Sequence, residues 1–335
     1  MSKRTVLFVA ALAILIPLAV GAQTDTGNQL VAAFSEWVAQ QEQADSDLAA
    51  RVADLEDRVA ELESRPAPTT TTTTTTPAPP PTTTTTTQPS GSLTPSGPIT
   101  VTQSNTVIEG RHFTGSSGDC VRIQGAANVT IRNSTFTNCH KAVYAVNASN
   151  VRVENIRCEA DMSNRGRNCV QFDKVTGGHV INSTSINTNG GTLAEDHISI
   201  YQSHGTAQNP ILVENNHIEG GGPSRSGSCI MTGDVGGSYQ VIRGNTCINP
   251  GQVGIGVSGG TNITVDDNTV VSDSFSWTNV GIYVWRYTGS QPCHSHTVTN
   301  NQVAWFNSSG NRNSFWNGGN CGSITIVSND VYYTP

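Results

Sequence analysis

Charged residues are scarce in this sequence of 335 residues. They make up 13 % of the chain, and the formal net charge is −7. A nucleic-acid-binding domain shows a basic surface, so the composition argues against nucleic acid as a partner. Aromatic residues are also scarce, at 6 %. The chain is instead rich in Asn, Thr, Ser and Gly, a composition that suits many short strands joined by tight turns.

The charge is spread unevenly, and cysteine is absent from the first third of the chain. Of the acidic and basic residues, 10 and 5 respectively lie before residue 99, and 15 and 13 lie after it. All eight cysteines lie between Cys120 and Cys321. An even set of cysteines in one domain predicts disulfides and an oxidising compartment. The chain therefore changes character near residue 99.

Residues 1–22 have the features of a secretory signal peptide. Lys3 and Arg4 precede an apolar run over residues 6–20, and the small residues Val20 and Ala22 allow cleavage after Ala22. A retained membrane anchor is the alternative, although the apolar run is short for a membrane span. The sequence thus predicts an extracellular protein, either secreted or held at the cell surface.

Residues 28–65 carry a helical pattern with a heptad seam whose regular part is Leu48, Val52, Leu55, Val59 and Leu62. Segments 51–56 and 58–63 both resemble the Arg-hydrophobic-x-x-hydrophobic-Glu pattern of short trimeric coiled coils, which favours a homotrimer through residues 48–62. Val at a and Leu at d favour a dimer instead. A single solvated helix is the third alternative.

Residues 66–98 consist largely of Thr and Pro, with Thr tracts at 69–76 and 82–87 on either side of a Pro-rich segment. Such tracts bury no apolar surface and run extended, so a disordered linker or stalk is predicted here.

A degenerate unit recurs over residues 99–335, and each copy begins with an apolar residue. These first positions are Ile108, Ile131, Val153, Ile181, Val213, Ile242, Val265, Val298 and Ile326. A second apolar position follows five residues later, at Phe113, Phe136, Cys158, Ile186, Ile218, Cys247, Val270, Val303 and Val331. A repeat of this kind fixes the architecture, because each unit must stack on its neighbours to bury its apolar face.

Each unit contains short β-stretches around a bend, and an asparagine recurs at one place in that bend. These residues are Asn216, Asn245, Asn268, Asn301 and Asn329. Asn tolerates left-handed backbone, and amides stacked over successive coils can bond to one another as a ladder. Strands of one coil pair in parallel with those of the next. The fold class predicted for residues 99–335 is therefore an all-β parallel β-helix of about nine coils.

The Asn-bearing bends and the coil length resemble the right-handed β-helix of the pectin-lyase-like superfamily. Segments 195–201, 220–224, 233–234 and 250–252 are similar to secreted bacterial right-handed β-helix proteins. This resemblance implies a right-handed helix. It is unspecific for function, because such helices host lyases, hydrolases, epimerases and non-catalytic adhesins. The calcium and Arg-base patterns of pectate lyases and the spaced Asp triad of polygalacturonases are not intact.

A coil stack also predicts the disulfides, because each coil touches only the adjacent ones and chain neighbours are spatial neighbours. The expected pairs are Cys120–Cys139, Cys158–Cys169, Cys229–Cys247 and Cys293–Cys321.

Long loops predict where the functional face lies. They follow Cys158, Ile186, Ile218 and Val270 at one edge of a strand stack, and loops 203–210 and 287–297 are expected to wall its other edge. Strand alternation gives a first outward column at Arg122, Tyr144, Gln171, Ser199, Met231, Gly256 and Tyr283. The second column is Gln124, Val146, Asp173, Tyr201, Gly233, Ser258 and Trp285. A groove over this face is the expected site for a polysaccharide.

The candidate site is centred on Asp173 and Tyr201. A polysaccharide lyase or C5-epimerase needs a base, for which Tyr201 or His197 is the candidate, and a group that neutralises the sugar carboxylate, for which Arg225 or Arg122 is the candidate. A glycoside hydrolase needs two carboxylates, and Asp173 with Asp196 is the predicted pair. Non-catalytic glycan binding is the alternative, as is an adhesin-like structural β-helix that forms a surface rod. Substrate-binding residues are expected to be Arg122, Tyr144, Gln171, Glu195, Tyr283 and Trp285.

No metal or other cofactor is predicted. His294 and His296 stand beside Cys293 without a clear third ligand. Asp266 and Asp267 allow a calcium site, but they fall in an Asn-bearing bend, where turn chemistry explains them better.

Overall fold

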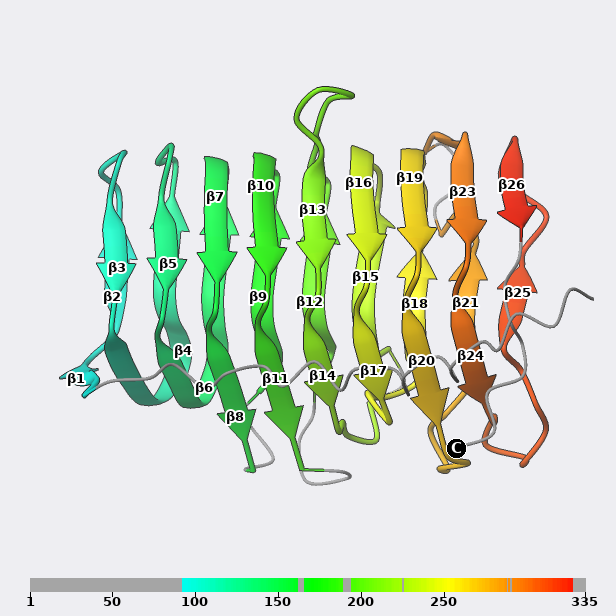
Figure 1. Ribbon diagram of the computed structural model, residues 1–335, viewed down its shortest axis with the longest axis horizontal. Coiled ribbons are helices and arrows are strands. Elements are labelled where there is room, and N and C mark those ends of the chain that lie inside the picture. The colour runs from blue at the N-terminus through cyan, green and yellow to red at the C-terminus, as the bar shows by residue number, and fades with distance from the viewer. Residues whose placement is uncertain are drawn as a thin grey trace, which may run out of the picture. The chain divides into compact units, whose positions relative to one another are not determined.

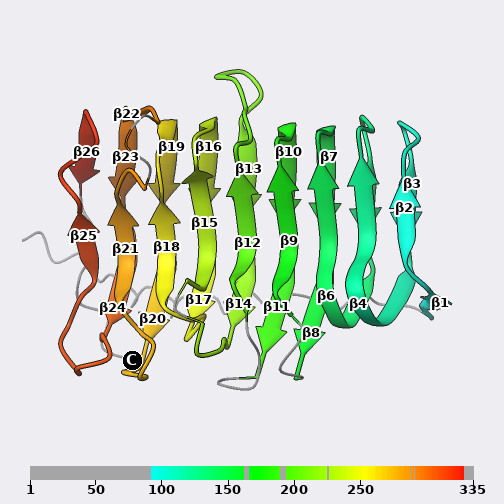
Figure 2. The same cartoon turned by 180° about the vertical axis from the view of Figure 1, so that it is seen from behind.

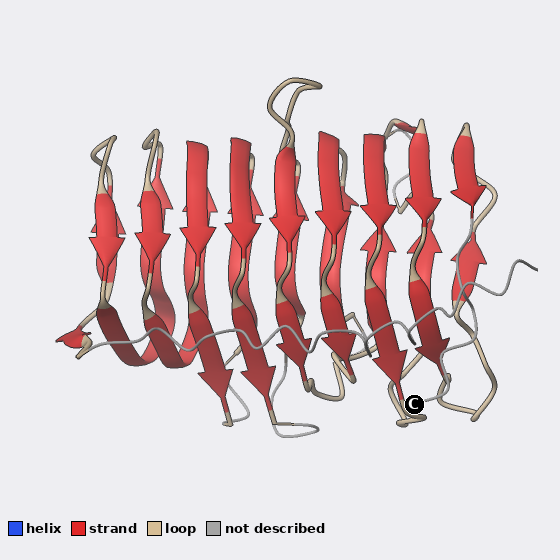
Figure 3. Cartoon of the chain, in the orientation of Figure 1, coloured by secondary structure: helices blue, strands red, loops and turns tan. Residues whose placement is uncertain are grey.

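The computed structural model describes residues 92–161, 166–188, 194–224, 226–287, 289 and 291–327. The predicted signal peptide, the helix at 28–65 and most of the linker at 66–98 lie outside these residues and stay predictions. The described chain consists of strands and loops (Figure 3), and it contains no helix long and apolar enough to cross a membrane. Its first strand, β1 (Thr94–Ser96), pairs with β4, so strand structure begins before the predicted boundary at residue 99.

The strands form three parallel stacks, and Figures 1 and 2 show the stacks from their two sides. Stack 1 contains β9 (Asn168–Asp173), β12 (Asp196–Tyr201), β15 (Ser228–Asp234), β18 (Val253–Val257), β21 (Val280–Val284) and β25 (Phe315–Asn317). Stack 2 contains β8 (Arg157–Ala160), β11 (Thr184–Asn187), β14 (His217–Glu219), β17 (Thr246–Ile248), β20 (Thr269–Ser272) and β24 (Gln302–Trp305).

Stack 3 forms the second sheet and contains β3 (Val107–Glu109), β5 (Thr130–Arg132), β7 (Ser149–Glu154), β10 (Thr176–Ile181), β13 (Ile211–Glu214), β16 (Ser238–Arg243), β19 (Gly260–Asp266), β23 (His296–Thr299) and β26 (Ile324–Val327). The short β22 (Cys293–His294) also pairs with β19, and β2 (Ile99–Val101) pairs with β4. The long strands β4 (Arg111–Gln124) and β6 (Thr135–Val146) run through both stack 1 and stack 2, so these two stacks are one continuous sheet.

The core lies between the stacks, and its columns run from coil to coil. In stack 1 the inward column is Val121, Val143, Val170, Ile198, Ile230, Ile255 and Ile282, all paired in register and all buried. Each such side chain contributes about 1.5–3 kcal/mol by leaving water. The predicted parallel β-helix, including the stacking of aliphatic residues inward, is confirmed.

The predicted repeat is correct in all the described coils except the fourth. Val180 pairs with both Val153 and Val213, so the first position of that coil is Val180 and not Ile181. The second position is Ser185 and not Ile186. Val180 and Ile181 are both apolar, so the pattern allowed a slip of one residue, which exchanges the two faces of a strand.

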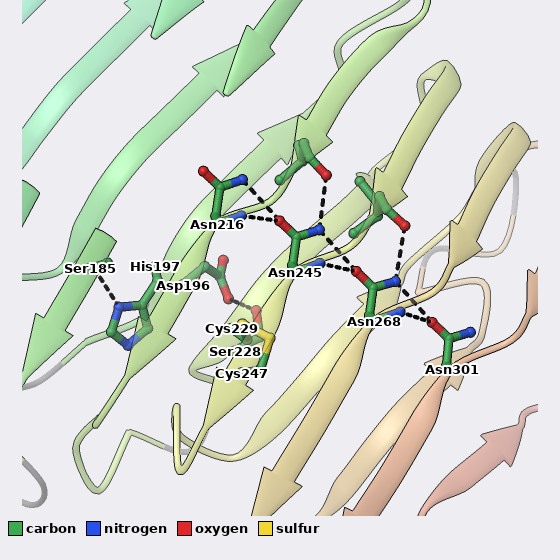
Figure 4. The surroundings of a disulfide bond; sticks show 12 residues. Ser185, Asp196, His197, Asn216, Ser228, Cys229, Asn245, Cys247, Asn268 and Asn301 are labelled. Carbon is green, nitrogen blue, oxygen red and sulfur yellow. Dashed lines mark hydrogen bonds between the residues drawn. A yellow bond between two sulfur atoms is a disulfide. The ribbon is translucent and has the colours of Figure 1, made fainter. Parts of the chain in front are cut away.

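The asparagine ladder forms as predicted (Figure 4). The Nδ2 atoms of Asn216, Asn245 and Asn268 donate to the Oδ1 atoms of Asn245, Asn268 and Asn301 respectively, each at 2.9 Å, and all four residues are buried. The left-handed backbone belongs to the preceding residue of each bend and not to the ladder asparagine: φ is +54° at Asn215 and +54° at Asp267. Asn329 lies outside the described residues.

All four predicted disulfides are present, at Cys120–Cys139, Cys158–Cys169, Cys229–Cys247 and Cys293–Cys321. A polar pair takes the place of a disulfide in one coil. Ser185 pairs in register with Cys158, and the Ser185 Oγ lies 2.7 Å from the Nδ1 of His197. A loop separates Ser185 from His197 along the chain, just as a loop separates Cys158 from Cys169.

Candidate functional site

The outward face of stack 1 carries the first predicted column in full. Arg122, Tyr144, Gln171, Ser199, Met231, Gly256 and Tyr283 pair in that order, and Tyr283 pairs further with Trp316 of β25. Sequence reasoning missed Trp316, although the alternation of the segment 315–317 continues the column.

A groove of about 500 Å³ lies over the later coils of this face. It is lined by Glu195, Asp196, Tyr201, Ser226, Met231, Asp234, Val235, Gln252, Val253, Asn279, Val280, Tyr283, Trp285, Tyr287 and Trp316. No Lys or Arg is among these lining residues, so within the described part of the chain the charge of the groove is acidic.

The floor of the groove is apolar and aromatic. Met231, Val253, Val280 and Tyr283 form a small buried cluster separate from the main core, and Trp285 packs against it. The Trp285 ring also contacts the rings of Tyr287 and Trp316, with centroid separations of 5.8 and 5.9 Å. Flat rings of this kind pack well on the apolar faces of sugars.

Two carboxyl groups with raised pKa values line the same groove. Asp196 is 7 % exposed, and its Oδ1 accepts a hydrogen bond of 2.6 Å from Ser228 Oγ. Burial, opposed by this hydrogen bond and reinforced by Glu195 and Asp234, raises the pKa of Asp196 to about 8. Burial and the charge of Glu195 raise the pKa of Asp234 to about 6. Asp196 is thus protonated at neutral pH, whereas Asp234 is largely ionised.

Asp234 is a groove residue that sequence reasoning missed. Tyr201 pairs with Asp234, because the register shifts between β12 and β15 after Ser199, so the predicted neighbour Gly233 is wrong. Gly233 has a φ of +61°, the left-handed geometry that a bulge glycine supplies. A glycine within a strand pattern was the signal that could have revealed the bulge.

Asp173 and Tyr201 pair in register as expected, but the groove is not centred on them. Asp173 accepts hydrogen bonds from Tyr144 Oη at 2.8 Å and Lys174 Nζ at 3.3 Å, and it does not line the groove. Burial, followed by the bond to Asp173, raises the pKa of Tyr144 to about 12. Of the central pair, Tyr201 lies at the groove's edge and Asp173 belongs to a neighbouring polar cluster.

His197 is directed into the interior of the coil and does not face the groove. It is fully buried, and its Nδ1 lies 2.7 Å from Ser185 Oγ (Figure 4). Its Nε2 lies 2.7 Å from the carbonyl oxygen of Gly220. Burial lowers the pKa of His197 to about 4, so the ring is neutral. These contacts hold His197 inside the coil and outside the groove lining, whereas it was predicted to lie in the groove as a candidate base.

The remaining predicted site residues divide between the two regions. Glu195, Tyr283 and Trp285 line the groove. Arg122 and Gln171 lie with Tyr144 in the earlier coils: Arg122 Nη1 donates to Asp119 at 2.9 Å, and Gln171 Oε1 accepts from Lys141 at 2.6 Å. Arg225 lies outside the described residues.

One of the two loops expected to wall the groove lies elsewhere. The loop 203–210 rises beyond β13 (Figure 1), and its Asn209 lines a separate hollow over stack 3 with Asn128, Asn150, Arg152 and His179. The loop at 287–297 does contribute Tyr287 to the groove. The chain passes from stack 1 to stack 3 at this edge, so an insertion there can project over either sheet.

Two of the three side chains that could ligate a metal are joined to each other. The ligand atoms of Cys293, His296 and Cys321 lie within 4.8 Å of one another, but the two sulfur atoms are joined as a disulfide. Asp266 Oδ1 accepts hydrogen bonds from Thr299 and Asn300, and Asp267 occupies the left-handed position of its bend. Turn chemistry therefore accounts for both aspartates.

The family model described as "Right handed beta helix region" matches residues 96–235. The domain is a right-handed parallel β-helix. The predicted right-handed β-helix is thus confirmed as the fold. No curated protein sequence matches the chain.

Solved structures with similar β-helices include a bacterial adhesin and two kinds of carbohydrate-active enzyme. PfbA, a surface adhesin of Streptococcus pneumoniae, has 13 % identity and a TM-score of 0.42, with 68 % of this chain and 69 % of that chain covered. The alginate lyase from Paenibacillus sp. str. FPU-7 has 15 % identity and a TM-score of 0.38 over 69 % and 88 %. The catalytic domain of a GH87 alpha-1,3-glucanase has 12 % identity and a TM-score of 0.35, and this chain spans 53 % of it. At these identities the likeness extends to the fold alone.

Proposed function

We propose that the groove on stack 1 binds a neutral polysaccharide outside the cell. The observation that carries this proposal is the composition of the groove: an apolar, aromatic floor, carboxyl groups at its edges, and no Lys or Arg among the described lining residues. Aromatic rings pack on sugar faces, and carboxyl oxygens accept hydrogen bonds from hydroxyl groups. Four disulfides and the predicted signal peptide support an extracellular location.

An anionic uronide is a poorer fit. The carboxylates of Glu195 and Asp234 repel a carboxylate in the groove, and a polysaccharide lyase or C5-epimerase needs a cation to neutralise it. Arg122 is paired with Asp119 away from the groove. Arg225, the other residue predicted to neutralise the carboxylate, lies outside the described residues.

Trp285→Ala is expected to weaken binding of a neutral polysaccharide by about 1–3 kcal/mol, by analogy with a nucleobase stacked on one aromatic side chain. Affinity electrophoresis through gels that contain dextran, a mixed-linkage β-glucan or galactomannan measures the change.

Trp277→Ala is the matched control, because Trp277 stacks on Phe275 and does not line the groove. Equal binding by wild type and Trp285→Ala, with equal melting temperatures, contradicts the proposed site. A change of oligomeric state in place of binding assigns the aromatic face to a subunit interface.

Hydrolysis of the bound polysaccharide is the second candidate function, favoured by the different protonation of Asp196 and Asp234. A glycoside hydrolase needs one protonated and one ionised carboxyl group on either side of the scissile bond. Asp196 opens β12 and Asp234 ends β15, so they stand at opposite ends of neighbouring strands that line the groove.

If the groove hydrolyses its polysaccharide, the pH profile of the hydrolysis rate will be bell-shaped. The rate will rise as Asp234 ionises near pH 6 and fall as Asp196 ionises near pH 8. Asp196→Asn is expected to lower the rate of release of reducing ends at least about 100-fold, because the proton donor is lost.

Asp173→Asn is the matched control, because Asp173 lies outside the groove. Full activity of Asp196→Asn, or equal loss in Asp173→Asn, excludes this assignment. If the protein binds the three polysaccharides but releases no reducing ends from any of them, the groove is a binding site without hydrolytic activity.

A further inference from the structure

Stack 1 carries a cationic region in the coils that precede the groove, in line with Asp196. Asp119 pairs with Lys141, and Lys141 pairs with Asn168. Asn168 in turn lies beside Asp196, since its Nδ2 donates to the Asp196 carbonyl oxygen at 2.6 Å. Lys141 and Asp196 are therefore two coil steps apart, about 10 Å along the stack axis. A polymer that follows the groove along this axis passes over both.

Most of the cations in this region have a carboxylate partner. Arg122 pairs with Asp119 at 2.9 Å, Lys174 with Asp173 at 3.3 Å, and Arg167 with Glu195. Lys141 is different: among the described residues no carboxylate lies within ion-pair distance of its ammonium group. Its Nζ donates to Gln171 Oε1 at 2.6 Å and lies 4.3 Å from the centroid of the Tyr144 ring. The positive charge of Lys141 is thus the one in this described region that no ion pair balances.

The surroundings of Lys141 make its charge available to a ligand. The side chain is partly buried, and burial lowers the pKa of its ammonium group. Arg122 lies against the same Tyr144 ring, 4.8 Å from its centroid, so two cations share one aromatic surface. A partly desolvated ammonium group that lacks a counter-ion gains from an anion that reaches it, because such an ion pair is stronger than one in open water.

We propose that Lys141 binds an acidic substituent of the polysaccharide whose neutral backbone occupies the groove. This inference rests on the proposed function and deepens it: the ligand is a neutral chain that carries a carboxylate, sulfate or phosphate group about two coils from Asp196. Lys141 has three ammonium hydrogens and uses one on Gln171, which leaves donors for the oxygens of such a group.

The proposal is tested by measuring how the full-length protein binds three neutral polysaccharides: dextran, mixed-linkage β-glucan and galactomannan. Each is compared with its sparsely carboxymethylated and sulfated forms. Affinity is measured at low and at 0.5 M salt. We expect an acidic form to bind about tenfold more tightly than its neutral parent at low salt, the effect of one charge-assisted contact. Lys141→Gln is expected to abolish this preference without changing the affinity for the neutral parent, whereas Lys141→Arg retains most of it. The carboxymethyl and sulfate arms show which acidic group fits.

Lys174→Gln is the matched control, because its ammonium is already paired with Asp173, and we expect it to keep the preference. Equal affinity for neutral and acidic forms in the wild type overturns the inference, as does a preference that survives Lys141→Gln. Both results leave the groove proposal standing if Trp285→Ala still weakens binding. Conversely, a Lys141-dependent preference that is insensitive to Trp285→Ala supports the cationic site and refutes the groove.

Discussion

Asn268→Ala is expected to lower the free energy of unfolding by about 4 kcal/mol, because it leaves several buried polar groups unpaired. The Asn268 Oδ1 accepts from both the backbone N and the Nδ2 of Asn245, and the Asn268 Nδ2 donates to Asn301 Oδ1 and to the Ile242 carbonyl oxygen. Alanine replaces none of these bonds, and water cannot reach them. Urea unfolding followed by circular dichroism measures the loss.

Asn128→Gly is the matched control. Asn128 belongs to a second, exposed row of amides, in which it donates to Asn105 and accepts from Asn150. Glycine keeps the left-handed backbone at this position, where φ is +56°, and water replaces the lost bonds. Its effect should stay below about 1 kcal/mol. Similar losses in the two variants would mean that the buried ladder contributes no more than a surface row.

Asp196→Asn is expected to make the protein more stable above neutral pH. The pKa of Asp196 is about 8 in the fold, against about 3.9 in an unfolded chain. The native state therefore keeps a proton that the unfolded state loses, and the free energy of unfolding falls as pH rises from 4 through 8. At about 1.4 kcal/mol per pKa unit, this cost is on the order of 4–6 kcal/mol. Asparagine resembles the neutral acid and can still accept the Ser228 hydrogen bond.

Free energies of unfolding at pH 5 and pH 9 for the wild type and Asp196→Asn test this expectation. The buried His197 and His296, whose pKa values burial lowers to about 4, reduce stability on the acid side, but they do so in both proteins. The difference between the two proteins therefore isolates Asp196. Parallel pH profiles would show that Asp196 is ionised in the fold at neutral pH. A variant that gains stability but loses hydrolysis would display the usual conflict between stability and a functional site.

The fold could be predicted because its signals recur in most of the coils. Apolar residues five positions apart, with a bend asparagine between them, fix the coil and the stacking, and strand alternation then gives the outward column from Arg122 to Tyr283. All four disulfides could be predicted because cysteines that are close in sequence lie in the same or adjacent coils.

The site was predicted less well where alternation breaks. At the start of β12, His197 and Ile198 are consecutive and both buried, so parity could not show that His197 points inward. At Gly233 a bulge moves Asp234 into the groove. The distribution of unpaired charge along stack 1 depends on which salt bridges form. Lys141 lies in the early coils, and the carboxyl groups of the groove lie in the later ones. Ion pairs such as Arg167–Glu195 join residues of different coils that no local pattern connects.

The short reach of the disulfides determines how this domain would respond to mechanical load. Each coil contacts only its neighbours, so a pull on one end detaches coils in sequence. The Cys229–Cys247 bond joins residues 18 apart and withholds the chain between them, about 60 Å when drawn straight, from the extension. Under a force transmitted by a polymer bound in the groove, the domain would therefore extend in short steps, each limited in length by a disulfide. Reduction of the disulfides would remove this limit and let the whole unfolded chain extend.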